Sequence, residues 1–329
     1  MTQAALSALS GFETSAFAPN FGLTVHAEPG DVGLLRGIDI AQATVRHGLI
    51  IFRGLKATRE QFEDFSKQAT PTFMIHVGLG REAISEDETT QTVAKGMHYL
   101  PAHIERGYAP PVPRFVFFYC ARPADNGGET TVYDGFDVLA ALTAPTRDFL
   151  RKAKLHWLLR LKPEVWAECF KTTDKATALS RFHRGVVSLN KNSPGTEIRA
   201  RFDGQTFMLD YVTPATYRSP RRAGEALANS CLSYFLRRQG HEQTIELHDG
   251  HGELFAESVL DEVRECSEKV VMPIQWSRGD FVCIDNRTVM HGRRAFNDPL
   301  RSVYIRLGME PPPPSMWSRM AATFKVVTD

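Results

Sequence analysis

The sequence predicts a mainly β protein with inserted helices, arranged as a β-sandwich or jelly roll. Runs rich in aromatic and β-branched residues lie near both ends of the chain, at 49–52, 115–120, 281–285 and 302–307. Such runs are typical of buried strands, and the helical patterns fall mostly between them. No internal repeat or low-complexity linker divides the chain, so we expect one domain over residues 1–329.

The first clear elements are a short strand and a helix. The run 49–52 is apolar and has a glycine close on each side, which indicates a buried strand. Residues 58–61 read Thr-Arg-Glu-Gln, the pattern of a capping box at the start of a helix. Phe62 and Phe65 would give that helix an apolar edge.

The next strands frame a turn. The aromatic run 115–120 predicts a buried strand, and the run 129–133 resumes strand composition after a polar, glycine-rich segment. That segment contains Asn126-Gly127, a dipeptide favoured in hairpins because both residues tolerate positive φ. We therefore expect the two strands to form an antiparallel pair.

Two stretches do not fit the pattern of buried strands joined by turns. We expect residues 152–271 to form a helical insertion, with a helix over 223–238 whose apolar residues share one face. The stretch 78–95 is polar, acidic and glycine-containing, so we expect a solvated surface loop, with a lid over the site as the alternative.

Composition and charge restrict the possible partners. Hydrophobic residues make up 43% of the chain, charged residues 23%, and the net charge is +1, so nothing favours nucleic acid or an anionic membrane as partner. No apolar run is long enough to span a bilayer, and the first residues do not resemble a signal peptide. The five cysteines are scattered and lack Cys-x-x-Cys spacing, as expected of reduced thiols in a cytoplasmic protein.

Two distant segments carry a candidate metal site. His103 and Glu105 would point to the same side of an extended strand, and His291 could add a third ligand from a distant strand. Two neutral imidazoles and one carboxylate on one face of an octahedral metal leave other positions open, as in non-haem Fe(II) oxygenases. A zinc hydrolase and a non-catalytic binding protein remain alternatives, although the helical His-Glu-x-x-His of many such hydrolases is absent.

Three further histidines, His241, His248 and His251, lie close together in sequence. No carboxylate or thiolate stands at ligand spacing in a strand-like frame beside them, so we expect a solvated loop there.

Several segments, taken together, resemble the TauD/TfdA-like family of Fe(II)/2-oxoglutarate-dependent dioxygenases. The chain is most similar to the subgroup with His-x-Glu in place of His-x-Asp, which includes hydroxylases of amino acids and of carrier-bound aminoacyl groups in natural-product biosynthesis. The matching segments occur in the family's order and span most of the chain outside the 152–271 region. They are 36–39, 47–54, His103 with Glu105, the proline and aromatic run to Cys120, 127–130, and 279–301.

The resemblance implies a double-stranded β-helix (jelly-roll) core with Fe(II) held by His103, Glu105 and His291. It also implies that 2-oxoglutarate chelates the iron and that Thr130 and an arginine after the distal histidine hold its far carboxylate. Arg301 stands near the family position of that arginine. An arginine fork and a hydroxyl suit a carboxylate, since they supply several charge-assisted or neutral donors.

Several neighbouring residues are candidates for other roles. Arg306 is the rival for the carboxylate and a tentative substrate contact; in one regular strand it would face away from Arg301. Tyr99 stands where relatives place another substrate contact. We expect Arg293 to be a surface or salt-bridge residue, and Asp285 with Asn286 to form a turn and support the ligands.

The activity implied by the resemblance is oxidation of an unactivated C–H bond, coupled to conversion of 2-oxoglutarate and O2 to succinate and carbon dioxide. We expect hydroxylation of an amino-acid-like small molecule or of an aminoacyl group on a carrier protein, in secondary metabolism. Desaturation or cyclisation would use the same site. Glu105 argues against halogenation, because related halogenases have a small residue there to admit chloride. A homo-oligomer is left open.

Overall fold

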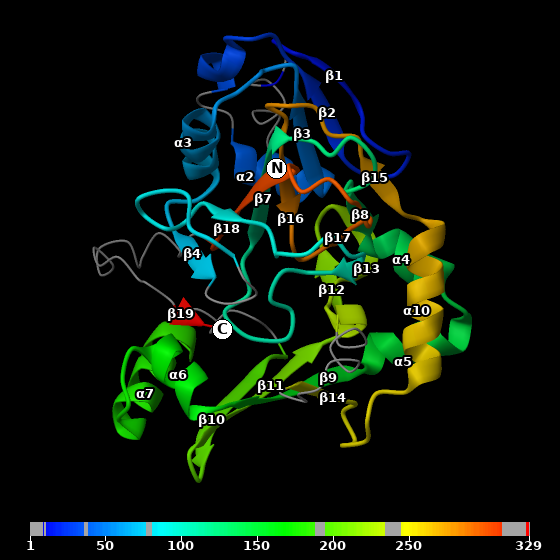
Figure 1. The fold of residues 1–329 in the computed structure, drawn as a ribbon. Coiled ribbons are helices and arrows are strands. Elements are labelled where there is room, and N and C mark those ends of the chain that lie inside the picture. The colour runs from blue at the N-terminus through cyan, green and yellow to red at the C-terminus, as the bar shows by residue number, and fades with distance from the viewer. Residues whose placement is uncertain are drawn as a thin grey trace.

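The computed structural model describes residues 9, 11–35, 39–76, 81–187, 195–233, 245–310 and 327–328. Figure 1 shows strands of the first and last thirds of the chain gathered in the upper part of the molecule, with the middle third below and to one side. Part of the 36–39 segment that contributes to the family resemblance lies outside the described residues, as do His241 and the start of the acidic stretch at 78–80.

The larger sheet has nine strands in the order β1-β2-β3-β16-β7-β18-β4-β19, with β5 paired to β18. The β2–β3 and β4–β19 pairs are parallel and the others are antiparallel. Its strands are β1 (Glu13–Ala16), β2 (Leu23–His26), β3 (Leu49–Arg53), β4 (Phe73–His76), β5 (Gln91–Thr92), β7 (Phe115–Arg122), β16 (Phe281–Asp285), β18 (Ser302–Gly308) and β19 (Val327–Thr328).

A four-stranded antiparallel sheet in the order β15-β8-β17-β6 faces the larger one. Its strands are β6 (Leu100–His103), β8 (Thr130–Asp134), β15 (Met272–Ile274) and β17 (Val289–Arg293). Apolar side chains from both sheets, among them Phe118, Val282, Ile305, Val132 and Val289, form one buried cluster between them. Two facing sheets with one apolar cluster between them confirm the predicted jelly roll.

Helices cover the other face of the larger sheet. They are α2 (Ile40–His47) and α3 (Arg59–Ala69), preceded by a 3₁₀ turn, η1 (Asp31–Leu35). Strand side chains alternate between the two faces, so Val282 enters the cluster between the sheets while Phe281 packs against Phe52, Phe62 and Phe65 under the helices. The predicted capping box is present, with the Thr58 hydroxyl and the Gln61 side chain each bonded to the other residue's backbone N–H.

The predicted hairpin between the runs 115–120 and 129–133 is wrong. Both runs are strands, β7 and β8, but β7 pairs with β16 and β18 whereas β8 pairs with β15 and β17. The intervening turn carries the chain from one sheet to the other. Gly127 has a φ of +69°, and a Cβ there would lie 2.3 Å from the carbonyl oxygen of Ala295, so this segment packs on the 295–296 loop.

The region 152–271 contains strands as well as the expected helices. It contains a four-stranded sheet in the order β10-β11-β9-β14, and a separate apolar cluster joins this sheet to the jelly-roll sheet formed by β15, β8, β17 and β6. The elements from 135 onward are α4 (Gly135–Ala141), α5 (Ala144–Lys152), β9 (Lys154–Leu161), α6 (Pro163–Phe170), α7 (Lys175–Phe182), the π-helical turn η2 (His183–Val187), β10 (Glu197–Asp203), β11 (Thr206–Pro214), β12 (Thr216–Ser219), β13 (Arg222–Leu227), β14 (Ile245–His248) and α10 (Glu257–Lys269).

The helix expected over 223–238 is therefore wrong in its first part. Residues 222–227 pair with β12 in an antiparallel ribbon, and Gly224, at a φ of +99°, has a backbone conformation unsuited to a helix interior. The described residues end at 233 there and resume at 245. Leu227, Cys231 and Leu232 are all buried in the same apolar cluster, as the spacing predicted, although Leu227 reaches it from a strand.

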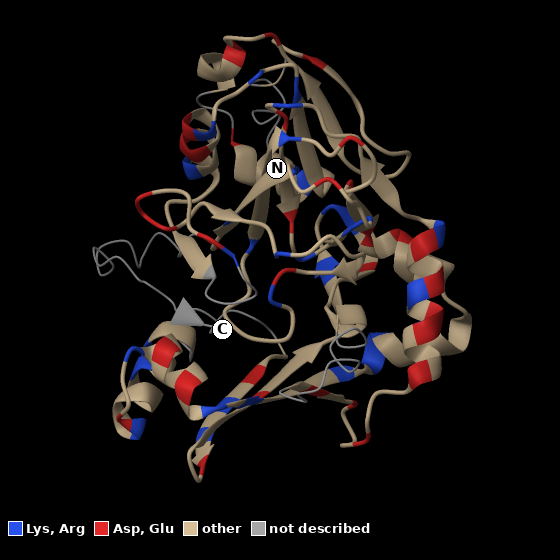
Figure 2. Ribbon diagram, in the orientation of Figure 1, with Lys and Arg blue, Asp and Glu red and all other residues tan. Residues whose placement is uncertain are grey.

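The cysteines and the distribution of surface charge are as expected from the sequence. All five cysteines are buried and free. Lys, Arg, Asp and Glu are interspersed over the ribbon, and α10 carries both signs along its length (Figure 2). In the part of the chain that the structure describes, no helix combines the length and the apolar character that crossing a membrane requires.

Replacing Thr58 by Ala removes the hydroxyl that caps α3, so we expect the free energy of unfolding to fall by about 1 kcal/mol. Urea unfolding of the wild type and the variant measures this change. Thr58→Ser keeps the hydroxyl and serves as the matched control; equal destabilisation by both substitutions would contradict the capping role.

Candidate active site

Two histidines meet across neighbouring strands. His103 is the last residue of β6, and His291 lies at the centre of β17, directly opposite it in the antiparallel register. Their ring centroids are 4.4 Å apart. Glu105 follows just beyond the end of β6, and its Oε2 lies 3.7 Å from Nε2 of His291. One ligand atom from each residue lies within 4.8 Å of the others, so the structure brings the three predicted metal ligands together.

The donor chemistry of this cluster suits a metal ion. His103 Nδ1 lies 2.8 Å from the carbonyl oxygen of Pro101. A carbonyl can only accept, so Nδ1 carries the proton and Nε2 keeps its lone pair. Burial, reinforced by the neighbouring His291, lowers the pKa of His103 to about 3, so its imidazole is neutral near pH 7. Two imidazoles and one carboxylate form the donor set associated with non-haem iron.

The backbone of the ligand segment is held from two sides. Asn286 is fully buried; its Oδ1 accepts from the Glu105 N–H at 2.8 Å, and its Nδ2 donates to the Glu105 carbonyl at 3.1 Å and the Pro113 carbonyl at 2.9 Å. On the other side, the Ile104 carbonyl accepts from the Ser230 hydroxyl at 2.8 Å. Asn286 thus has the supporting position expected of it. A side chain from the turn between β16 and β17 and one from the 152–271 region together hold the backbone at 104–105.

Asp285 forms the expected turn. Its carboxylate pairs with Arg114 and accepts from the Thr288 hydroxyl at 3.0 Å and the Arg287 N–H at 3.0 Å. The buried Asp285 carboxylate therefore stabilises the turn between β16 and β17. From this turn the Asn286 side chain points toward Glu105.

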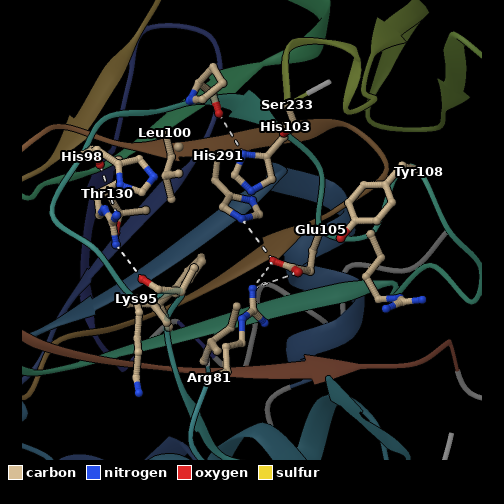
Figure 3. A pocket seen from close by; sticks show the side chains of 18 of the residues that line it. Arg81, Lys95, His98, Leu100, His103, Glu105, Tyr108, Thr130, Ser233 and His291 are labelled. Carbon is tan, nitrogen blue, oxygen red and sulfur yellow. Dashed lines mark hydrogen bonds and ion pairs between the residues drawn. The ribbon is translucent and has the colours of Figure 1, made fainter. Parts of the chain in front are cut away.

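The three candidate ligands open onto a cavity of about 320 Å³, within the usual range for small-molecule sites. Figure 3 shows His103, His291 and Glu105 together, with Thr130 and His98 on one side and Tyr108 on the other. The residues that line it are Arg81, Val93, Ala94, Lys95, His98, Leu100, Pro101, His103, Glu105, Arg106, Tyr108, Phe118, Thr130, Ser233, His291, Gly292, Arg293, Arg301 and Ile305.

Thr130 and Arg301, the expected carboxylate-binding residues, both line this cavity. The Thr130 hydroxyl accepts from Trp276 Nε1 at 3.1 Å, so its own proton can be donated. Arg301 Nε donates to the Gly128 carbonyl at 2.8 Å, and its guanidinium lies 5.1 Å from the centre of the Phe296 ring. Burial, together with the nearby Arg293, lowers the pKa of Arg301 to about 10, so it stays cationic near pH 7.

The two tentative substrate contacts lie away from the cavity. Arg306 donates to the Ser66 hydroxyl at 2.6 Å and to the Thr89 hydroxyl at 2.7 Å, on the α3 side of the larger sheet. It faces away from Arg301, as strand alternation predicts. The Tyr99 hydroxyl donates to Glu268 of α10 at 2.7 Å. Neither residue belongs to the cavity lining, so the structure does not support the expectation that they contact substrate.

The structure corrects the expectations for Arg293 and the acidic stretch. Arg293 is buried in the cavity wall and donates to the carbonyls of Ala94 and His98, at 2.9 and 3.1 Å, rather than lying on the surface. The described part of the acidic stretch, 81–95, exposes its acidic residues as expected, but it also packs across β18 through β5 and supplies four lining residues, so it is more than a solvated loop.

Arg81 is the charged residue closest to the candidate ligands among the lining residues that the sequence did not predict. Its guanidinium Nη2 lies 3.0 Å from each carboxylate oxygen of Glu105, and its side chain is only 5% exposed. No motif surrounds it, and the acidic residues that follow it in sequence drew attention to the surface instead.

Comparison with known proteins agrees with this site and fold. The model of the family described as "Taurine catabolism dioxygenase TauD, TfdA family" matches residues 19–307. A clavaminate synthase-like protein of Arabidopsis thaliana is 25% identical over 273 residues, which cover 77% of this chain and 79% of that protein. The dapdiamide synthesis protein DdaC of Enterobacter agglomerans is 23% identical over 282 residues, covering 79% and 82%.

Among solved structures, a taurine dioxygenase from Burkholderia xenovorans superposes with a TM-score of 0.54 at 16% identity, covering 92% of both chains. At this identity the likeness shows the fold. The family match spans most of the chain and shows more: the protein belongs to the TauD/TfdA family of dioxygenases, enzymes that use Fe(II), 2-oxoglutarate and dioxygen.

Proposed function

We propose that His103, Glu105 and His291 hold the iron and that the cavity in front of them binds 2-oxoglutarate and a small amino-acid-like substrate. The observation that carries this proposal is the convergence of three ligand atoms within 4.8 Å, from two neighbouring strands, on one cavity. The bound iron, with 2-oxoglutarate and dioxygen, supplies the oxidising power, and succinate and carbon dioxide are released.

The far carboxylate of 2-oxoglutarate is assigned to Arg301 and Thr130. Nε of Arg301 is occupied by the Gly128 carbonyl, and no hydrogen bond from described residues reaches its two terminal nitrogens. A guanidinium fork matches a carboxylate in two parallel charge-assisted bonds, and the Thr130 hydroxyl, itself bonded by Trp276, adds a third donor. These groups lie on rigid strand ends, so they are positioned before the cosubstrate arrives.

The chain's contribution is to orient the reactants and exclude water. Glu105 and His291 are almost fully buried and His103 is half-buried, and the cavity is walled by apolar side chains such as Phe118, Leu100 and Ile305. A substrate C–H bond is oxidised according to which hydrogen the walls hold nearest the metal, so hydroxylation, desaturation and cyclisation use the same residues.

Named relatives support a role in natural-product biosynthesis. DdaC is a dapdiamide synthesis protein, a second relative from Fischerella ambigua is an isocyanoethenyl-indole synthase, and PvcB is described as an Fe, alpha-ketoglutarate dependent oxygenase from an isonitrile synthetic pathway. By analogy, we infer that the substrate is amino-acid-like, either free or attached to a carrier protein, and that hydroxylation is the main outcome. A cytoplasmic location stays a prediction.

Anaerobic titration of the apoprotein with Fe(II) and 2-oxoglutarate tests the metal assignment. We expect a visible charge-transfer band that requires both additions in the wild type and is lost in His103→Ala, because one of three ligands is gone. Circular dichroism should show an unchanged fold. His248→Ala, which removes a histidine bonded to Glu246 on a different sheet, should keep the band. An undiminished band in His103→Ala would rule out the triad.

Replacing Arg301 by Leu should weaken 2-oxoglutarate binding about 100-fold, because a buried carboxylate loses its charged partner. The same charge-transfer band, titrated with 2-oxoglutarate at fixed Fe(II), measures the affinity. Arg306→Leu provides the comparison, since Arg306 faces α3, and it should alter stability rather than cosubstrate affinity. The reverse pattern would transfer the assignment to Arg306.

Replacing Asn286 by Ala should reduce Fe(II) affinity by about 10- to 100-fold, the usual effect of removing a group that supports a metal ligand. The physical reason is that the Glu105 backbone loses both of its bonds to this side chain. Anaerobic calorimetry measures the affinity, and Asn20→Ala, which removes a surface amide, is the control. Equal affinities for wild type and Asn286→Ala would contradict the supporting role.

A further inference from the structure

Arg81 has a place in the cavity that the proposed iron and 2-oxoglutarate sites do not explain. Figure 3 shows it on the side of Glu105 away from His103 and His291, and Thr130 lies on another side of the cluster. One of its nitrogens, Nη2, contacts both oxygens of Glu105 at 3.0 Å. Its side chain is 5% exposed, so it is held within the protein rather than extended into solvent.

Most of the hydrogen-bonding capacity of Arg81 is unused. Its Nε and Nη1 atoms are buried and have no hydrogen-bond partner among the described residues. A guanidinium has five N–H donors, and those on Nε and Nη1 are the three that Glu105 does not engage. Buried N–H groups in proteins are rarely left unpaired, and charged donors least of all. This arrangement indicates that a bound molecule supplies the hydrogen-bond acceptor for Nε and Nη1 of Arg81.

The charge of the cavity identifies the acceptor as an anion. Its described lining contains five cationic side chains, Arg81, Lys95, Arg106, Arg293 and Arg301, but one carboxylate, Glu105. The two negative charges of 2-oxoglutarate are matched by the two positive charges of the iron, so binding the cofactors does not neutralise this excess. A further anionic group would be attracted into the site.

The cosubstrate does not account for Arg81, because the far carboxylate of 2-oxoglutarate is assigned to Arg301 and Thr130. Arg301 bonds to Gly128, two residues from Thr130, whereas Arg81 contacts Glu105. The acceptor for Arg81 therefore belongs to the other reactant.

We propose that Arg81 binds a carboxylate of the substrate beside the metal position, and that the enzyme acts on a free small acid. This inference rests on the proposed function and narrows it. An aminoacyl group on a carrier protein is a thioester and has no free α-carboxylate, so the geometry favours the free substrate over the carrier-bound one. The segment 81–95, which supplies Arg81 and three further wall residues, becomes the part of the chain that selects the substrate.

The test uses the Fe(II)- and 2-oxoglutarate-loaded protein under anaerobic conditions. The standard L-amino acids and their C-terminal amides are added as matched pairs, and the shift of the charge-transfer band reports binding near the metal. We expect one or more acids to shift the band and their amides to bind about 10- to 100-fold more weakly, the usual worth of a charge-assisted hydrogen bond in a buried site.

Three variants separate substrate binding from support of Glu105. Arg81→Gln should keep the band but lose the preference for acids, and Arg81→Lys should retain part of it because the charge remains. Arg53→Gln, which removes an arginine 3.2 Å from the buried Asp280 carboxylate on another face, should behave as the wild type.

Several results would overturn the inference. In the wild type, amides that bind as well as acids, or no response to any acid, would contradict it. In Arg81→Gln, an unchanged preference for acids would also contradict it. Loss of the band itself in Arg81→Gln would assign Arg81 to holding Glu105 instead. Absence of the band in the wild type would overturn the proposed function and this inference with it, whereas a normal band without acid preference overturns this inference alone.

Discussion

The site depends on one antiparallel register, the pairing of β17 with β6 that sets His291 opposite His103. A shift of β17 by one residue would turn His291 to the opposite face of the sheet from His103, because side chains alternate along a strand. The register is fixed on both sides of β17. On one side lies β6, and on the other β8 pairs residue by residue from Val289 to Arg293. The buried turn at Asp285 fixes the point at which β17 begins.

Much of this could be predicted from the sequence because the signals were local. The capping box at Thr58, the buried runs of β3, β7 and β16, and the ligand spacing of His103 and Glu105 depend on neighbouring residues, and the structure shows each of them. Alternation along β18 also correctly separated Arg301 from Arg306. His291 could be offered as a third ligand from its residue type alone, but no local pattern links residue 291 to residue 103, and the family resemblance was needed to select it among the other histidines.

The failures share a physical cause. Asn126-Gly127 favours a tight turn, so the sequence predicted a hairpin of β7 and β8. The strands that they pair with lie far away in sequence, and a local pattern cannot indicate them. Residues 222–227 match helical spacing and are held in a strand by β12. Arg81 and Arg293 read as surface residues because charged side chains usually lie there, and only the folded cavity shows them buried.

The carboxylate of Glu268, near the end of α10, contacts three segments in or beside the sheet that carries His103 and His291. It accepts from Tyr99 before β6 and from Tyr133 of β8, and it pairs with Arg294 after β17 at 2.7 Å. Burial and this carboxylate raise the pKa of Tyr133 to about 12, so its hydroxyl is a permanent donor. The middle region of the chain can therefore be exchanged for that of a relative only if an acceptor stands at position 268. Without it, three donors beside β6, β8 and β17 would lose their common partner, and a graft intended to change substrate choice would disturb the strands that carry the candidate metal ligands.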